Sequence, residues 1–138
     1  MHKKTILFLG VAIAVLFLMN AVFGPINITK AANSPVTGYA WSDNIGWMQM
    51  NPAFGGVQVD DATGIFSGYA WSDNIGWIDF APASGFPETP NEGAKLNLST
   101  GQITGWIKAL SAANGWDGWI KTNGVSADLG TGAFSGYA

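Results

Sequence analysis

The stretch Gly38-Tyr-Ala-Trp-Ser-Asp-Asn-Ile-Gly-Trp47 determines how the fold is predicted, because the same ten residues return unchanged at 68–77. A looser version begins at Gly105, and a fourth begins at Gly136. The glycines that open successive copies are 30, 37 and 31 residues apart. Self-similarity at such spacings is typical of repeat architectures. The sequence therefore predicts copies at 38–67, 68–104 and 105–135, with the start of a fourth at 136–138.

Each copy is predicted to consist of β-strands. The residues at 57–59 alternate between apolar and polar, and longer strands are predicted at 65–71 and 76–80, with turns at 61–64 and 72–75. Glycine is dense after residue 31, and no apolar stripe of helical period appears there. The predicted fold is all-β, with three to four tandem β-meander or hairpin repeats of 30–37 residues.

Two arrangements of these repeats are open. In a closed, prism-like or propeller-like one, 125–138 completes the first copy, which lacks its own Val-x-Val strand, and no sheet edge is left unpaired. In an open one, the copies form a solenoid-like stack. The chain stops at Ala138 within a predicted strand, so a fragment of a longer array is the alternative to true closure.

Strand parity divides each predicted hairpin into two faces. One face is expected to form the core, and it holds Ala40, Met48, Met50, Phe66, Ala70, Ile78, Phe80, Ile120 and Thr122. The other face mixes aromatic residues with Gln49, Asp79 and Lys121, and its rings are Tyr39, Trp41, Trp47, Tyr69, Trp71, Trp77 and Trp119. Glycines beside these rings are expected to leave room for them or for a neighbouring backbone.

The first 31 residues have the features of an export signal. Lys3 and Lys4 precede an apolar run, and small residues stand before a predicted cleavage site after Ala31. Cleavage would leave a domain at 32–138. The alternative is an uncleaved anchor, because 5–23 is borderline in length for a membrane span. Both interpretations predict a secreted or cell-surface protein that meets the membrane only through this segment.

Charge and missing residue types exclude several classes of function. The predicted mature domain keeps three lysines, no arginine and all nine acidic residues, giving a net charge of −6, which argues against binding nucleic acid or anionic lipid. It has no cysteine, and the single histidine is His2. The usual zinc ligands and the Ser-His and Cys-His nucleophile pairs are therefore missing. Paired carboxylates remain, but Glu88 and Glu92 are predicted to be solvated in a proline-rich loop, and no enzyme is predicted.

The aromatic residues have two interpretations. The favoured one is structural: because two copies keep the same rings, Trp and Tyr would fill the space between stacked repeats. The alternative is a carbohydrate platform, in which rings stack on sugars while turn residues such as Asn44 and Asn74 bond hydroxyl groups. The candidate ligand-binding residues are Tyr39, Trp41, Trp47, Tyr69, Trp71, Trp77, Trp116 and Trp119. Asp43 and Asp73 are weak candidates for calcium, with one carboxylate per turn, and no other metal or cofactor is predicted.

The Gly-Tyr-Ala-Trp-Ser-Asp-Asn-Ile-Gly-Trp motif resembles repeats in exported proteins of uncultivated bacteria, and the likeness covers nearly all of 32–138. That family implies export and repetition but no specific activity. The Gly-Trp dipeptides also resemble those of cell-wall-binding modules in Gram-positive surface proteins, although those modules are longer and basic. We therefore expect a non-catalytic structural or adhesive cell-surface protein, with a glycan-binding module as the alternative. The expected partners are surface or extracellular glycans, or further copies of the same repeat.

Overall fold

The computed structural model describes residues 32–112 and 115–138, and the predicted signal or anchor at 1–31 lies outside them. The described residues form thirteen β-strands and no helix, which confirms the all-β class. None of them forms a helix that could cross a membrane. The strands are β1 (Asn33–Pro35), β2 (Tyr39–Ser42), β3 (Gly46–Gln49), β4 (Gln58–Asp60), β5 (Phe66–Ser67), β6 (Tyr69–Ser72), β7 (Gly76–Asp79), β8 (Lys95–Leu96), β9 (Ile103–Thr104), β10 (Trp106–Ala109), β11 (Trp119–Lys121), β12 (Val125–Ala127) and β13 (Phe134–Gly136).

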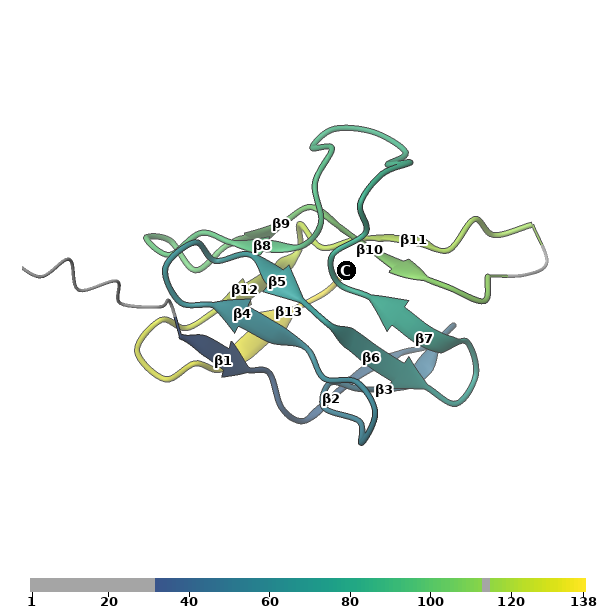
Figure 1. Ribbon diagram of the computed structural model, residues 1–138, viewed down its shortest axis with the longest axis horizontal. Helices are drawn as coiled ribbons and strands as arrows, with labels where there is room; N and C mark the ends of the chain where they lie inside the picture. The colour runs from purple at the N-terminus through teal and green to yellow at the C-terminus, as the bar shows by residue number, and fades with distance from the viewer. Residues whose placement is uncertain (1–31, 113–114) are drawn as a thin grey trace, which may run out of the picture. The chain divides into compact units, whose positions relative to one another are not determined.

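Six of these strands form one antiparallel sheet in the order β11-β10-β7-β6-β3-β2 (Figure 1). The sheet consists of three hairpins, β2–β3, β6–β7 and β10–β11. In the first hairpin Trp41 lies opposite Trp47, and in the second Trp71 lies opposite Trp77. The two identical stretches of sequence therefore adopt the same strand pairing.

Successive hairpins in this sheet are shifted along the strands. Gln49 lies opposite both Tyr39 of its own hairpin and Trp71 of the next one. Since Trp71 corresponds in sequence to Trp41, the second hairpin is displaced by two residues. Lys108 lies opposite Asp79, which gives the third hairpin the same displacement. An even shift keeps every side chain on its face, so the outward-facing residues of all three hairpins share one surface.

Side chains also join the first two hairpins. The hydroxyl of Ser72 and the side-chain amide of Asn74 both donate hydrogen bonds to the carbonyl oxygen of Ile45, each at 3.0 Å. A Cβ atom at Gly46 would lie only 2.5 Å from the amide nitrogen of Asn74. The Gly, Ser and Asn positions of the ten-residue motif therefore serve the contact between neighbouring hairpins.

The remaining strands form three short hairpin sheets. β4–β5 is extended by β1, and the other two are β8–β9 and β12–β13. Single bridges connect them in chain order, from Ile65 to Lys95 and from Gln102 to Ser126. β1 pairs with β4, and no pairing of β1 with the strands of 125–138 occurs among the described residues. The short sheets and the six-stranded sheet share one core, formed by Val36, Val57, Phe66, Ala70, Ile78, Phe80, Ala94, Leu96, Ile103, Ile107 and Ala127.

The predicted strand 65–71 is wrong in one respect, because Gly68 divides it into β5 and β6, which belong to different sheets. Gly68 has a φ of 85°, and a Cβ atom there would overlap the carbonyl oxygen of Gly56. The same overlap with a backbone carbonyl would occur at the glycines that open the third and fourth copies, Gly105 and Gly136. A copy therefore contributes to two sheets instead of forming one three-stranded meander.

The turn between β4 and β5 begins at Asp60, one residue before its predicted position. The Asp60 carboxylate accepts hydrogen bonds from the backbone amides of Ala62 and Thr63, at 2.9 and 2.7 Å, and from the Thr63 hydroxyl at 2.9 Å. Asp128 accepts from two backbone amides in the corresponding turn of the third copy. Asn97 does the same in the second copy. A side-chain oxygen at this position therefore closes all three turns.

The turn carboxylates predict a dependence of stability on pH. The Thr63 hydroxyl, and next its backbone amide, lower the pKa of Asp60, and the amides of Thr131 and Gly130 lower the pKa of Asp128. A lowered pKa in the folded state stabilises the protein above the unfolded-state pKa of about 3.9, and this stabilisation is lost as the pH falls through the folded value. We therefore expect the denaturant midpoint to decrease below about pH 4.

The matched control for this pH dependence is the double variant Asp60→Asn, Asp128→Asn. Asn97 shows that asparagine supports the same turn, so the variant should fold. Urea denaturation at a series of pH values should show a smaller loss of stability in acid for the variant than for the original chain. Equal losses would show that the turn carboxylates do not contribute.

Candidate functional site: the aromatic face

The predicted division of the hairpins into two faces is confirmed by burial. Ala70 and Ile78 are fully buried, and Met48, Met50 and Ile120 pack against the core. The opposite side of the six-stranded sheet, here called the aromatic face, holds the Trp and Tyr residues of the hairpins. These residues form cluster 1 (Tyr39, Trp41, Trp47), cluster 2 (Tyr69, Trp71, Trp77) and cluster 3 (Trp106, Trp119, with Lys108).

Cluster 1 is the most exposed of the three. Tyr39, Trp41 and Trp47 are 67%, 58% and 61% exposed. The Trp47 ring lies between the other two, 5.1 Å from Trp41 and 6.3 Å from Tyr39 between ring centroids. The interplanar angles are 59° and 86°, which are favourable arrangements for aromatic pairs. The three rings therefore hold one another in fixed orientations while most of their surface faces solvent.

Cluster 2 repeats this geometry with less exposure. Its Trp71 and Trp77 centroids are 4.9 Å apart, and Tyr69 and Trp77 are 6.4 Å apart. Both tryptophans are partly buried, and Tyr69 is 42% exposed. The linker that follows the first hairpin accounts for the difference, since a Cβ at Gly55 would lie 2.7 Å from a Trp77 ring atom. The backbone of this linker thus lies directly against cluster 2.

Cluster 3 contains a lysine where the other clusters have a tryptophan. The ammonium group of Lys108 lies 4.4 Å from the centre of a Trp119 ring, within cation–π range. Trp106 and Trp119 are 6.3 Å apart with an interplanar angle of 81°. Trp106 is only 7% exposed, although the corresponding residues in the other clusters, Tyr39 and Tyr69, are exposed.

The proline-rich linker at 81–93 covers cluster 3. The Phe86 ring packs on Trp119 with centroids 5.3 Å apart, and the indole N–H of Trp106 donates to the Glu88 carbonyl oxygen at 3.2 Å. The Glu88 carboxylate also forms a salt bridge with Lys121. Glu88 is exposed, as predicted for this loop, and its backbone carbonyl and its carboxylate both attach the linker to the aromatic face.

The structure places the candidate residues in different settings. Clusters 1 and 2 bring six of them together on neighbouring hairpins, and Trp119 lies under the linker beside Phe86. Trp116 is partly buried in the loop between β10 and β11. Trp106 also belongs to the face and was not among the predicted site residues, although it occupies the position of Tyr39 and Tyr69 in the third copy. Within the described residues, the rings of cluster 1 remain widely exposed and are not covered by another repeat.

The aspartates in the turns of the first two hairpins accept hydrogen bonds from tryptophan side chains. The Asp73 carboxylate accepts a hydrogen bond from the Trp71 indole at 2.8 Å, and Asp43 accepts one from Trp41 at 3.4 Å. Among residues 32–112 and 115–138, no three His, Cys, Asp or Glu side chains gather where they could hold a metal ion. In the described chain, each of these two carboxylates therefore orients a ring.

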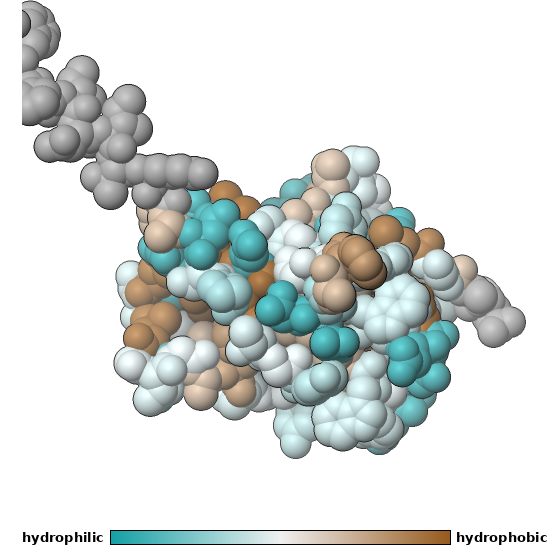
Figure 2. All heavy atoms as spheres, turned by 60° about the horizontal axis from the view of Figure 1, so that its bottom comes forward, coloured by the Kyte–Doolittle hydropathy of each residue, from teal (hydrophilic) through white to brown (hydrophobic). Residues whose placement is uncertain are grey.

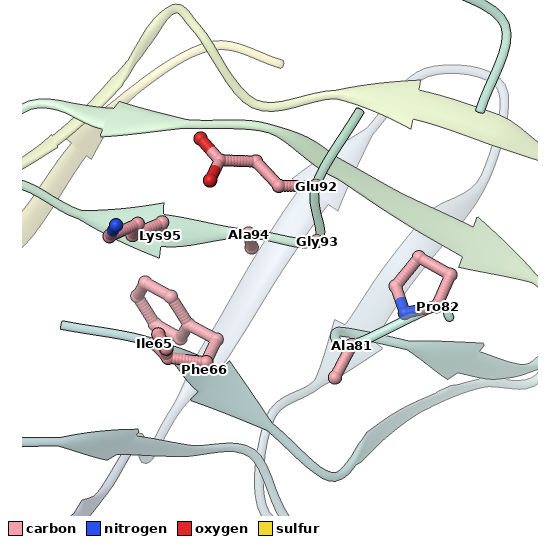
Figure 3. Close-up of a pocket in the computed structure, with 8 residues that line it drawn as sticks. All are labelled: Ile65, Phe66, Ala81, Pro82, Glu92, Gly93, Ala94 and Lys95. Atoms are coloured by element: carbon pink, nitrogen blue, oxygen red, sulfur yellow. The ribbon is translucent and has the colours of Figure 1, made fainter. Parts of the chain in front are cut away.

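One hollow has no residue of the three aromatic clusters in its lining. It has a volume of about 160 Å³ and is bounded by Phe66, Ala81, Pro82 and the segment from Glu92 to Lys95. Figure 3 shows the Glu92 and Lys95 side chains extending in one direction, away from Ala81 and Pro82. Pockets for small molecules usually measure about 300–1,000 Å³. The hollow is smaller than this and presents a single carboxylate, so it lacks the carboxylate pair of a glycosidase.

Figure 2 shows a surface that mixes hydrophilic, intermediate and hydrophobic residues. Trp and Tyr fall in the pale middle of this scale, so hydropathy alone does not mark an aromatic surface. The described chain is an all-β domain with an aromatic candidate binding face. Comparison with protein-family models, curated proteins and solved structures finds no match for the chain.

Proposed function

We propose that this chain is an exported, non-catalytic adhesive β-repeat protein of the cell surface. Its contact surface is the aromatic face, with cluster 1 at the centre. The observation that carries this proposal is the exposure of three adjoining rings, between 58% and 67%, on one hairpin. Exposed Trp and Tyr residues are enriched at binding surfaces, because they bury a large area with few rotatable bonds.

The rigidity of cluster 1 supports the same proposal. Trp47 is wedged between Trp41 and Tyr39, and the Trp41 indole is tied to Asp43. A partner therefore meets rings whose orientations are already set, and less conformational entropy is lost on binding. None of the three rings of cluster 1 belongs to the apolar core cluster of the described residues. This combination fits a binding role better than a role in stability.

Carbohydrate is the second candidate for the ligand. Aromatic rings stack on the apolar faces of sugars, and the rim of cluster 1 offers hydrogen-bonding groups from Asp43, Asn44 and Gln49. The domain carries a negative charge, and the rim of cluster 1 includes the acidic Asp43. A neutral polysaccharide is therefore a better fit than an anionic one.

We also propose that the hairpins form an open row and not a closed ring. The two-residue shift recurs at both junctions, and β2 and β11 stand at the two ends of the sheet. Ser42 and Asn44 on the first hairpin are identical to Ser72 and Asn74, which join the second hairpin to the first. An open row keeps the clusters on one accessible surface.

The proposed function is tested by retention of the purified chain on insoluble cell-wall material, cellulose and chitin. The double variant Trp41→Ala, Trp47→Ala should lose at least about tenfold in affinity for the material that binds, equivalent to about 1.4 kcal/mol. Leu98→Ala is the matched control, because Leu98 is an exposed apolar residue outside the aromatic face. Equal retention of both chains on a material that binds would contradict the proposal that cluster 1 is the contact surface.

A further inference from the structure

We propose that cluster 1 binds an extended peptide segment that contains proline and an aromatic residue and is presented by a partner protein. This inference rests on the proposed function, because it names a partner for the same contact surface. Its basis is the linker at 81–93, which already occupies the corresponding surface of the third hairpin. The chain thereby shows which kind of ligand fits an aromatic cluster of this geometry.

The linker uses three groups of the third hairpin. Trp119 receives the Phe86 ring, the Trp106 N–H binds the Glu88 carbonyl oxygen, and Lys121 binds the Glu88 carboxylate. Together these contacts hold an aromatic side chain, a backbone carbonyl two residues later and a polar group. Aromatic-lined surfaces of this kind are a known mode of recognising extended, proline-containing segments.

Cluster 1 offers a corresponding group at each of these positions. Strand pairing places Trp106 opposite Lys121 and, in the first hairpin, Tyr39 opposite Gln49. Trp47 then corresponds to Trp119, and it is 61% exposed beside Trp41 and Tyr39. The Tyr39 hydroxyl can donate to a backbone carbonyl as the Trp106 N–H does. Cluster 1 therefore reproduces the ring and the donor that hold the linker.

The third position distinguishes the partner from the linker itself. Gln49 stands in place of Lys121 and is uncharged, and its amide donates to the Asn51 carbonyl oxygen at 3.4 Å, a long hydrogen bond. Asp43 adds a negative charge beside the cluster. A segment with an uncharged polar residue should therefore bind better than one with glutamate at the position of Glu88.

The linker at 81–93 is bound at cluster 3, and the shorter linker that contains Gly55 lies against cluster 2. Among the described residues, cluster 1 is the cluster whose rings are all widely exposed. A segment from a partner would give cluster 1 the cover that the chain itself provides for its other two hairpins.

The probe is a synthetic peptide with the sequence of residues 81–93, prepared with the native glutamate and with Glu88→Gln. Isothermal titration into the full chain should show binding of both peptides, with the glutamine peptide at least about threefold tighter. Replacing Phe86 and Pro87 with alanine in the peptide should abolish binding. The Trp47→Ala chain should lose at least about tenfold in affinity, whereas Leu98→Ala should leave it unchanged.

Tyr39→Phe provides a second variant that removes only a hydroxyl group, and we expect it to weaken peptide binding by about three- to tenfold while the fold is retained by circular dichroism. Peptide binding that persists in both variants would place the peptide elsewhere and overturn the inference. Retention of the chain on glycans without peptide binding would overturn this inference and leave the proposed function standing. Failure of both assays would overturn both.

Discussion

Replacing Gly68 with alanine is expected to lower the free energy of unfolding by about 3–5 kcal/mol. Two effects add at this position. The φ of 85° is unfavourable for any residue with a Cβ atom, and that atom would overlap the carbonyl oxygen of Gly56. Backbone must move to relieve the overlap, at the point where β5 passes into β6 and the chain changes sheet. Urea denaturation followed by circular dichroism measures the loss.

Gly38→Ala is the matched control for this prediction. Gly38 opens the first copy as Gly68 opens the second, and its φ of 92° is similar, but no atom lies within 4 Å of the Cβ position. Its substitution should therefore lower the free energy of unfolding only through the unfavourable φ, by about 1–2 kcal/mol. Equal losses of stability for the two variants would show that the overlap with Gly56 adds no cost to the substitution at Gly68.

The second large effect is expected for Ile78→Ala, at about 2–5 kcal/mol. Ile78 is fully buried in the core shared by the two sets of strands. Truncating it removes apolar surface from the core and leaves a cavity, and the sheets on either side limit how far the site can collapse. The loss can be measured by urea or thermal denaturation.

Met48→Ala is the control for Ile78, because the two residues occupy the same position in hairpins of identical strand pairing. Met48 is only partly buried and lies nearer the end of the sheet. Its truncation should cost roughly half as much as that of Ile78. A larger loss at Met48 would contradict the placement of the core beneath the second hairpin.

The two faces of the hairpins could be predicted because they depend only on the two-residue period of a strand. Ile78 and Met48 were placed inward, and Trp77 and Trp47 outward, by parity alone. The identical pairing of the first two hairpins was implied by the ten residues that they share, 38–47 and 68–77. These features are local, and each can be read from the sequence at both 38–47 and 68–77.

The change of sheet at Gly68 could not be predicted, because it depends on a contact with Gly56 that the strand period does not contain. The turn at Asp60 could have been predicted more closely. Both Asp60 and Asp61 suit the first position of a turn, but Asn97 and Asp128 align with Asp60, whereas leucines align with Asp61. Agreement across the copies was the stronger signal at this position.

The difference in exposure among the three aromatic clusters also could not be predicted from the sequence. The rings of cluster 3 are covered because the linker at 81–93 folds back over Trp106 and Trp119. The length and composition of a linker do not reveal which surface it contacts. The repeat predicted three similar faces, and the linkers, which are the least similar parts of the copies, make them different.

The most direct test of cluster 1 as a contact surface is hydroxyl-radical footprinting of the full chain, with oxidation of each tryptophan measured by mass spectrometry. Trp41 and Trp47 should react fastest, Trp71 and Trp77 more slowly, and Trp106 slowest, in the order of their exposure. Unfolding in urea should bring all five to similar rates, which controls for differences in intrinsic reactivity. Protection of Trp41 and Trp47 to the level of Trp106 in the folded chain would contradict the account.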